Sequence, residues 1–222
     1  MPIKGSGEAA PRTINRFDGG VGWIAYPQEG MQRASQALAT DAGVILIDPI
    51  EAPDIETTYE EFGDVIGVVV LLDRHERDAA AFARRHDVPV GVPSALSNVS
   101  PDDTETVPLP DLLAGTDYRE ASVSTPLWDE AVVVDETNGT LVVPEALGTA
   151  GFFRAGDERL GVHPALRLTP PRRLREFDVE RVLVGHGEGI LTDGSVAIRD
   201  AVDNSRRRAP AAYLGALREF IA

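Results

Sequence analysis

The stretch LLDRHERDAAAFARRHDVPV, residues 71–90, decides the fold class. An apolar run ends at Asp73, and a charged cluster follows as far as Asp78. From Glu76 to His86 the apolar positions have a helical spacing, and the VPV after them is typical of a short strand. The stretch therefore predicts strand, charged loop, helix and strand, an α/β arrangement. The charged loop is either a metal site at a strand end or a helix start capped by a carboxylate.

The rest of the first half extends this pattern. Two apolar segments, 21–27 and 43–49, are predicted strands, and each closes with a proline. An acidic, partly helical segment at 51–64 leads into a predicted strand at 65–73. Residues 1–16 contain Gly, Ser and Pro without a periodic apolar pattern, which indicates a mobile tail.

The second half has a different character. Residues 131–147 form two apolar runs around Asn-Gly at 138–139, the strongest short hairpin signal in the sequence. A helix, a strand at 181–184 and a sharp Gly-His-Gly turn follow, and the remainder predicts two helical stretches broken near Pro210. The sequence shows neither an internal repeat nor a stretch with the composition of an interdomain linker. We therefore expect one domain over residues 17–222.

Composition excludes several classes of protein and site. The chain has 222 residues, a net charge of −15 and no cysteine, and Lys4 is its only lysine. Without cysteine there are no disulfides or thiolate metal sites, so a metal would need His, Asp and Glu. Such an acidic chain is not expected to bind nucleic acid or anionic membranes. We expect a cytoplasmic protein, since the N-terminal segment lacks an apolar core, and salt adaptation explains the acidity best.

The order of these elements resembles the metallo-β-lactamase-fold hydrolases. In that family a strand ends near an Ile-Asp-x-Gly element, and here VILIDP places Asp48 at that point. A hairpin ending in a bridging Asp resembles GTLVVPEAL, with Glu145 at that position, and a late strand ending in a ligand His resembles VERVLVGHGEGI, with His186. The resemblance covers roughly residues 20–200. It implies a four-layer αββα sandwich, with two central sheets, helices outside and the site at one edge between the sheets.

The charged loop carries the resemblance further and also departs from it. The family's His-x-His-x-Asp-His corresponds to Asp73-x-His75-x-Arg77-Asp78, so only one of its histidines remains. The stretch ASVSTPLWDE, where the family has a further ligand His, contains no histidine. Arg77 stands where the family has an Asp that binds the second metal, and a guanidinium cannot bind a cation. We expect Arg77 to replace that charge by pairing with Asp78 or Glu145.

Two functions follow from this resemblance. In the first, His75, Asp78, Glu145 and His186 hold one Zn, Mn or Fe ion, Asp73 assists, and the protein hydrolyses a small molecule with metal-activated water. In the second, the protein contains no metal and is a non-catalytic binding or regulatory module. The sequence leaves both functions open.

Individual residues also have purely structural interpretations. His75 could be a polar residue at a helix start, and Glu145 an exposed carboxylate beside a loop. Asp48 is expected to be a scaffold residue, and His86 to interact with a helix C-terminus. His163 is expected to be solvated, although its loop is a place to look for a proton donor.

Two rival motifs are weak. VLVGHGEGIL has the glycine spacing of a dinucleotide loop, but the strand with an acidic residue that this fingerprint requires does not follow it. A serine hydrolase is equally disfavoured, since there is no Gly-x-Ser-x-Gly motif and neither Ser124 nor Ser195 has an evident His partner.

Overall fold

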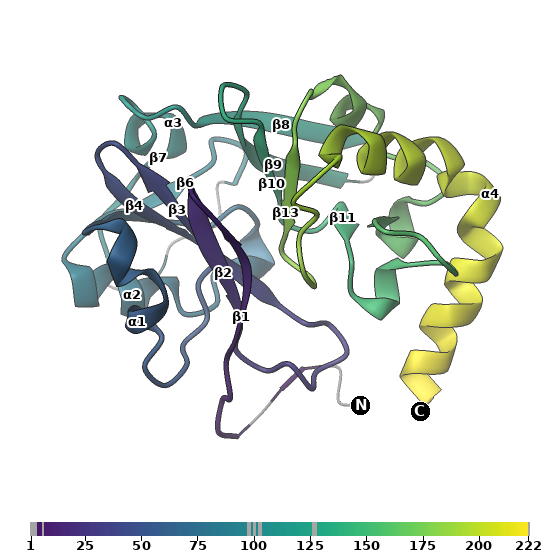
Figure 1. The fold of residues 1–222 in the computed structure, drawn as a ribbon, viewed down its shortest axis with the longest axis horizontal. Helices are drawn as coiled ribbons and strands as arrows, with labels where there is room; N and C mark the ends of the chain where they lie inside the picture. The colour runs from purple at the N-terminus through teal and green to yellow at the C-terminus, as the bar shows by residue number, and fades with distance from the viewer. Residues whose placement is uncertain are drawn as a thin grey trace.

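The structure is a computed structural model that describes residues 4–5, 7–96, 99, 101, 104–125 and 128–221, with side chains as far as residue 215. It contains two larger β-sheets, one two-stranded sheet and flanking helices (Figure 1). Within this part of the chain, no helix has both the length and the apolar content to cross a membrane.

The first sheet is built from the N-terminal half and has seven strands in sequence order. Its first four strands are antiparallel, and the pairs from β4 to β7 are parallel. The strands are β1 (Arg12–Phe17), β2 (Gly20–Ile24), β3 (Ala34–Thr40), β4 (Gly43–Ile47), β5 (Val65–Val69), β6 (Val90–Val92) and β7 (Thr106–Pro108).

The second sheet comes from the C-terminal half, in the order β13-β10-β9-β8. The predicted hairpin around residues 138–139 is confirmed, because β9 and β10 pair antiparallel with Thr140 opposite Asp135. The strands are β8 (Arg119–Thr125), β9 (Trp128–Asp135), β10 (Thr140–Val143) and β13 (Arg181–Val184), and β11 (Leu147–Gly148) pairs with β12 (Gly161–Val162) in the small sheet.

The helices are mostly short. α2 and α4 are the two of eight residues or more. The α-helices are α1 (Glu56–Tyr59), α2 (Ala79–His86), α3 (Leu109–Leu112) and α4 (Gly194–Ile221), and the 3-10 helices are η1 (Glu60–Phe62), η2 (Asp73–His75), η3 (Gly151–Phe153), η4 (Pro164–Leu166) and η5 (Arg172–Glu176).

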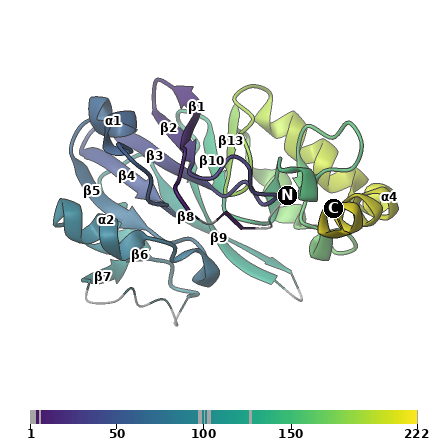
Figure 2. The ribbon, with the colours of Figure 1, turned by 90° about the horizontal axis from the view of Figure 1, so that it is seen from below.

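Alternation along the strands produces the layers. In β4, Leu46 belongs to a core cluster with Phe82 of α2, whereas its neighbour Ile45 belongs to the cluster between the two sheets. In β10, Val142 faces that same central cluster, and Leu141 packs in the cluster that contains α4. Figure 2 shows α1 and α2 on one side of the sheets and α4 on the other. The predicted four-layer αββα sandwich of the metallo-β-lactamase type is confirmed.

Several local predictions are wrong. β1 begins at Arg12, inside the predicted tail, of which residues 1–3 and 6 lie outside the described residues. β3, with the sequence ASQALAT, was not predicted because its apolar side chains are mostly alanine. α4 continues through Pro210 as one helix instead of breaking there. The segment at 51–64, by contrast, is partly helical as predicted, with the short helices α1 and η1.

Candidate metal site

The candidate site lies where strands of both sheets end. His75 is in η2, beyond the end of β5, Glu145 follows β10, and His186 follows β13. All three side chains are buried, and each offers one ligand atom within 4.8 Å of those of the other two. The imidazole rings of His75 and His186 are 5.4 Å apart, centroid to centroid. The structure therefore gathers three of the four predicted ligands in one place.

His75 is oriented by Asp48, at the end of β4. The Nδ1 of His75 lies 2.8 Å from Oδ2 of Asp48, and the other oxygen of Asp48 accepts the amide of Leu71 at 2.9 Å. Burial raises the pKa of Asp48 to about 6, although Arg77 opposes the shift, and burial lowers the pKa of His75 well below its ordinary value. A neutral His75 that donates from Nδ1 has its lone pair on Nε2, which faces Glu145 Oε2 at 3.8 Å.

His186 is oriented by a backbone carbonyl. Its Nδ1 lies 2.9 Å from the oxygen of Met31, which can only accept, so Nδ1 carries the proton and Nε2 the lone pair. Burial, together with His75, holds the pKa of His186 well below its ordinary value. The Nε2 is buried and has no hydrogen-bond partner among the described residues. Phe153 stacks on the other side of this ring, with centroids 5.3 Å apart.

Glu145 is the carboxylate of the group, and one of its oxygens, Oε2, already accepts a hydrogen bond. Arg74 donates from Nε to Oε2, and the Nε2 of His163 lies 3.9 Å from Oε1. Burial raises the pKa of Glu145, while the charge and hydrogen bond of Arg74 oppose that shift. Glu145 is only 7% exposed, so it is not the exposed carboxylate that the structural interpretation assumed.

Arg77 does not pair with a carboxylate, contrary to the expectation. Its guanidinium donates to the carbonyl oxygens of Ala34 at 2.6 Å, Asp48 at 2.8 Å and Gly185 at 3.2 Å. Burial lowers the pKa of Arg77, and Asp48 acts in the opposite direction. Its backbone is left-handed, with φ 44°. Arg77 thus joins the ends of β3, β4 and β13 around the site.

Asp73 and Asp78 lie outside the three-residue group. Asp78 accepts the amide of Glu51 at 2.8 Å, which fastens the start of α2 to the loop after β4. Asp73 is at the rim: its side chain is 60% exposed, and its Oδ1 accepts the amide of Arg74 at 2.7 Å and lies 3.5 Å from Nη1 of Arg74. Neither carboxylate points its oxygens to the imidazoles.

Three further residues near the site, Arg74, Glu130 and His163, were not among the predicted metal ligands or catalytic residues. His163, expected to be solvated, is packed against Trp128, Phe152 and Phe153. Its Nδ1 accepts the amide of Ala165 at 3.2 Å, so its proton is on Nε2, facing Glu145. Burial lowers the pKa of His163 to about 4. No periodic pattern in the sequence marks this loop.

Glu130, on β9, supports the segment that carries Glu145. Its carboxylate accepts the amide of Ala146 at 3.0 and 2.8 Å and the indole N–H of Trp128 at 2.8 Å. It is 2% exposed, and burial raises its pKa to about 7 in spite of these hydrogen bonds. Trp128 lies in turn under the guanidinium of Arg74, 4.6 Å from ring centroid to Cζ. Alternation in β9 predicts that some side chains point inward, but not that one is a glutamate held by two donors, the amide of Ala146 and the indole of Trp128.

The donor set fits a metal ion. Metal-binding histidines commonly donate their second N–H to a carboxylate or a backbone carbonyl, which leaves the other nitrogen free for the metal. His75 and His186 have these two arrangements, and the buried Nε2 of His186 lacks another partner among the described residues. Two imidazoles and one carboxylate suit Zn or Fe. His75, Glu145 and His186 could therefore hold one ion.

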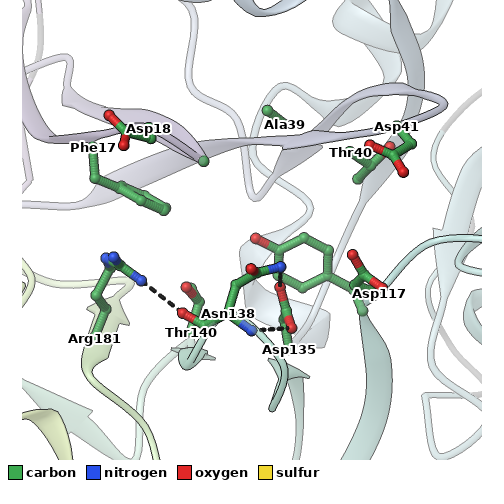
Figure 3. A pocket seen from close by; sticks show the side chains of 12 residues that line it. Phe17, Asp18, Ala39, Thr40, Asp41, Asp117, Asp135, Asn138, Thr140 and Arg181 are labelled. Atoms are coloured by element: carbon green, nitrogen blue, oxygen red, sulfur yellow. Dashed lines mark hydrogen bonds between the residues drawn. The ribbon is translucent and has the colours of Figure 1, made fainter.

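A separate cavity of about 430 Å³ lies at the opposite ends of β10 and β13. Figure 3 shows Phe17 of the first sheet facing Arg181 of the second, whose Cζ lies 4.9 Å from the centroid of the ring. Asp135 there accepts both the backbone and the side-chain N–H of Asn138, which stabilises the turn between β9 and β10. None of the predicted site residues lines this cavity.

Solved structures with the same fold span several kinds of protein. No protein-family model matches the chain, and no curated protein matches it. The metallo-β-lactamase FIM-1 from Pseudomonas aeruginosa in its mono-zinc form is 11% identical, with 92% of this chain and 97% of that chain covered and a TM-score of 0.53. TTHA1623 in a di-iron-bound form is 17% identical over 78% of this chain and 94% of that one, with a TM-score of 0.54.

A sensor protein also has this fold. The apo state of the chemotaxis sensor ODP from T. denticola is 13% identical, with 87% of this chain and 94% of that chain covered and a TM-score of 0.51. At these identities the likeness shows the fold alone. The chain thus has the metallo-β-lactamase fold, with a divergent sequence and a partial set of metal-binding residues.

Proposed function

We propose that this protein is a mononuclear metal-dependent hydrolase of a small molecule, with His75, Glu145 and His186 as its metal ligands. The observation that carries the proposal is the pair of buried imidazoles whose Nε2 lone pairs face a buried carboxylate, with that of His186 free of any partner among the described residues. A buried polar atom without a partner is costly, so its persistence at such a cluster supports a ligand there.

The surrounding residues have distinct tasks in this proposal. Asp48 and the carbonyl of Met31 hold the two histidines in the tautomers that leave Nε2 available. When bound, the ion supplies Lewis acidity that activates water for attack on the substrate. His163, neutral and with its proton on Nε2, lies 3.9 Å from Glu145 Oε1 and would be the proton donor on that side of the site. Asp78 is not among the ligands, because the amide of Glu51 engages its carboxylate.

The arrangement of Arg77 supports one ion instead of two. Its guanidinium donates to three carbonyl oxygens at the ends of β3, β4 and β13. A buried positive charge is therefore already present beside His75 and His186. A second cation would meet its repulsion in a medium of low dielectric constant. The mono-zinc and di-iron forms of the fold relatives support Zn or Fe as the ion, and Mn remains compatible with the same donors.

The first test is metal content. We expect inductively coupled plasma mass spectrometry of protein purified without chelators to find about one equivalent of Zn, Mn or Fe, because three protein ligands and water complete a catalytic site. His186→Ala should lose the ion. His86→Ala is the matched control, since the Nε2 of His86 lies 3.0 Å from the hydroxyl of Tyr59 and His86 is outside the site.

The outcomes separate the two functions. A metal retained in His86→Ala and lost in His186→Ala would justify screening esters, thioesters and phosphodiesters. If the wild type contains no metal and gains no thermal stability when Zn²⁺, Mn²⁺ or Fe²⁺ is added, the hydrolase proposal fails.

One observation favours the second function, a metal-free binding or regulatory module. Arg74 bonds to Glu145, so the buried carboxylate has a counter-charge without any metal. One of the solved structures with this fold is a chemotaxis sensor, which is consistent with a regulatory role. In that case the site around His75, Glu145 and His186 would bind a small molecule without turnover, and the next experiment would be a screen for that ligand.

A further inference from the structure

Arg74 is placed between the candidate site and solvent. Its side chain is 46% exposed, its guanidinium stacks on Trp128, and its Nε donates to Oε2 of Glu145. Oε2 is also the oxygen that faces the Nε2 of His75 at 3.8 Å. One carboxylate oxygen therefore serves both the arginine and the candidate metal position.

A carboxylate oxygen that donates electron density to a metal ion is a weaker acceptor for a guanidinium, and two cations on one oxygen repel each other. Of the two oxygens of Glu145, Oε2 is the one that faces the Nε2 of His75, at 3.8 Å, whereas Oε1 faces the Nε2 of His163, at 3.9 Å. The bond from Arg74 must therefore break or lengthen when an ion binds to His75, Glu145 and His186.

Arg74 has a second acceptor within reach. The Oδ1 of Asp73 lies 3.5 Å from Nη1 of Arg74, and the Asp73 side chain is 60% exposed. A small movement of the Arg74 guanidinium across the Trp128 ring would exchange Glu145 for Asp73 as its acceptor. The positive charge of Arg74 would stay partly exposed and paired. This gives Asp73 a task that does not require it to bind metal.

We propose that Arg74 is a built-in competitor of the metal: it neutralises Glu145 when the ion is absent and moves toward Asp73 when the ion binds, and so sets the metal affinity of the site. The proposal rests on the proposed metal site. It differs from the hypothesis drawn from the sequence, which gave this electrostatic task to Arg77. The structure shows Arg77 bonded to carbonyl oxygens and Arg74 bonded to the carboxylate.

The test is the Zn²⁺ affinity of the full chain, stripped with chelator and dialysed, measured by competition with a chromophoric chelator. Arg74→Gln removes the charge and should bind Zn²⁺ about tenfold more tightly, since a charge-assisted hydrogen bond to a partly exposed group no longer opposes the ion. Arg74→Lys keeps the charge and should return the affinity toward that of the wild type.

The matched control is Arg85→Gln. Arg85 is a partly exposed arginine of α2 that pairs with Glu51 and Glu56, outside the site. Its substitution should leave the Zn²⁺ affinity unchanged, because exposed charges beyond a Debye length contribute little. A second readout is the melting temperature in chelator, which should fall by about 3 °C in Arg74→Gln because Glu145 loses its partner.

The outcomes are distinct. Tighter binding in Arg74→Gln alone, with a larger gain in melting temperature on adding Zn²⁺, supports the competition. Equal or weaker binding in Arg74→Gln than in the wild type overturns it while the metal site stands. If the wild type and all variants fail to bind Zn²⁺, the metal site falls and the competition falls with it.

Discussion

Asp48 has a left-handed backbone conformation, with φ 47°, just beyond the end of β4. This conformation is uncommon for a residue other than glycine, and it turns the carboxylate back toward Leu71 and His75. The sequence indicated only a scaffold residue at that point. The structure shows that the scaffold task and the site are coupled, because the same carboxylate selects the tautomer of His75.

Asp48→Asn should weaken Zn²⁺ binding by about 10- to 100-fold, the usual effect of removing a carboxylate that supports a metal-binding histidine. Asparagine has one acceptor oxygen where Asp48 uses two, so either Leu71 or His75 loses a partner. The resulting loss of stability should be about 1–3 kcal/mol. Calorimetric Zn²⁺ titration and thermal melting measure the two effects.

The control for this variant is Asp54→Asn, in an exposed turn with a similar left-handed backbone. It makes the same chemical change away from the site and should alter neither quantity. Unchanged Zn²⁺ affinity in Asp48→Asn would contradict the role that we assign to Asp48.

At this scale the family resemblance predicted that His75, Asp78, Glu145 and His186 lie together, and the structure brings three of them, without Asp78, into one buried group. The sequence did not identify Arg74, Glu130 or His163. Whether an arginine turns toward a carboxylate or toward carbonyl oxygens depends on local backbone angles and on partners distant in the sequence. The exchange of roles between Arg74 and Arg77 is an example.

Element boundaries differ from the predictions where local bonds compete with periodicity. The helical spacing began at Glu76, yet α2 begins at Ala79, because Asp73–His75 forms the 3-10 helix η2 and Arg77 has a positive φ. In α4, Pro210 lies on an exposed face of a helix whose preceding turns are packed against the core, so tertiary packing outweighs the lost hydrogen bond.

β9 and the segment after β10 are joined by Glu130, and this connection should depend on pH. The pKa of Glu130 is raised from 4.5 to about 7 in the folded protein. The folded state therefore binds the proton more tightly, so this contribution to stability is fully present below pH 4.5 and is lost as the pH rises through about 7. The difference corresponds to about 3 kcal/mol.

Glu130→Gln stays neutral at every pH and should remove that loss. In metal-free buffer we expect the variant to gain stability relative to the wild type between about pH 5 and pH 8. The buried histidines oppose the trend in both proteins, since their lowered pKa values give stability that is lost at acid pH, so the comparison isolates Glu130. Denaturant unfolding at each pH is the measurement.

Glu136→Gln provides the comparison for an exposed glutamate, since Glu136 pairs with Arg119 at the surface. Its unfolding free energy should follow that of the wild type across the pH range. Parallel curves for the wild type and Glu130→Gln would show that the proton on Glu130 does not contribute.

At the scale of the whole molecule, the net charge of −15 makes like charges repel across the surface. We expect the melting temperature to rise as KCl increases from about 0.1 M to about 1 M, because the Debye length shortens from about 10 Å to about 3 Å. Sucrose, which favours compact states by exclusion without screening charge, serves as the control. A melting temperature insensitive to KCl would show that repulsion is not a significant cost.

The four-layer arrangement was predicted from the family resemblance, which rests on the order of the apolar strands, the charged loop and the hairpin at residues 138–139; the residue patterns alone predicted only an α/β architecture. The order of the strands in the sequence does not reveal which hydrogen bonds join the two sheets near the site. Gln36 of β3 donates to the carbonyl of Val184, and the amide of Ala34 donates to that of Gly185. These contacts place His186 from the other half of the chain.

The three carbonyl bonds of Arg77 have a consequence for how the protein would acquire an ion. These bonds hold the strand ends together without a metal ion, so folding and metal binding would be separate events. Small zinc domains differ, because they remain unfolded until zinc binds. The protein would be long-lived in its empty form, and removing the ion would return it to that form without denaturation. Its occupancy would then follow the supply of metal in its surroundings, rising and falling within the lifetime of a single molecule.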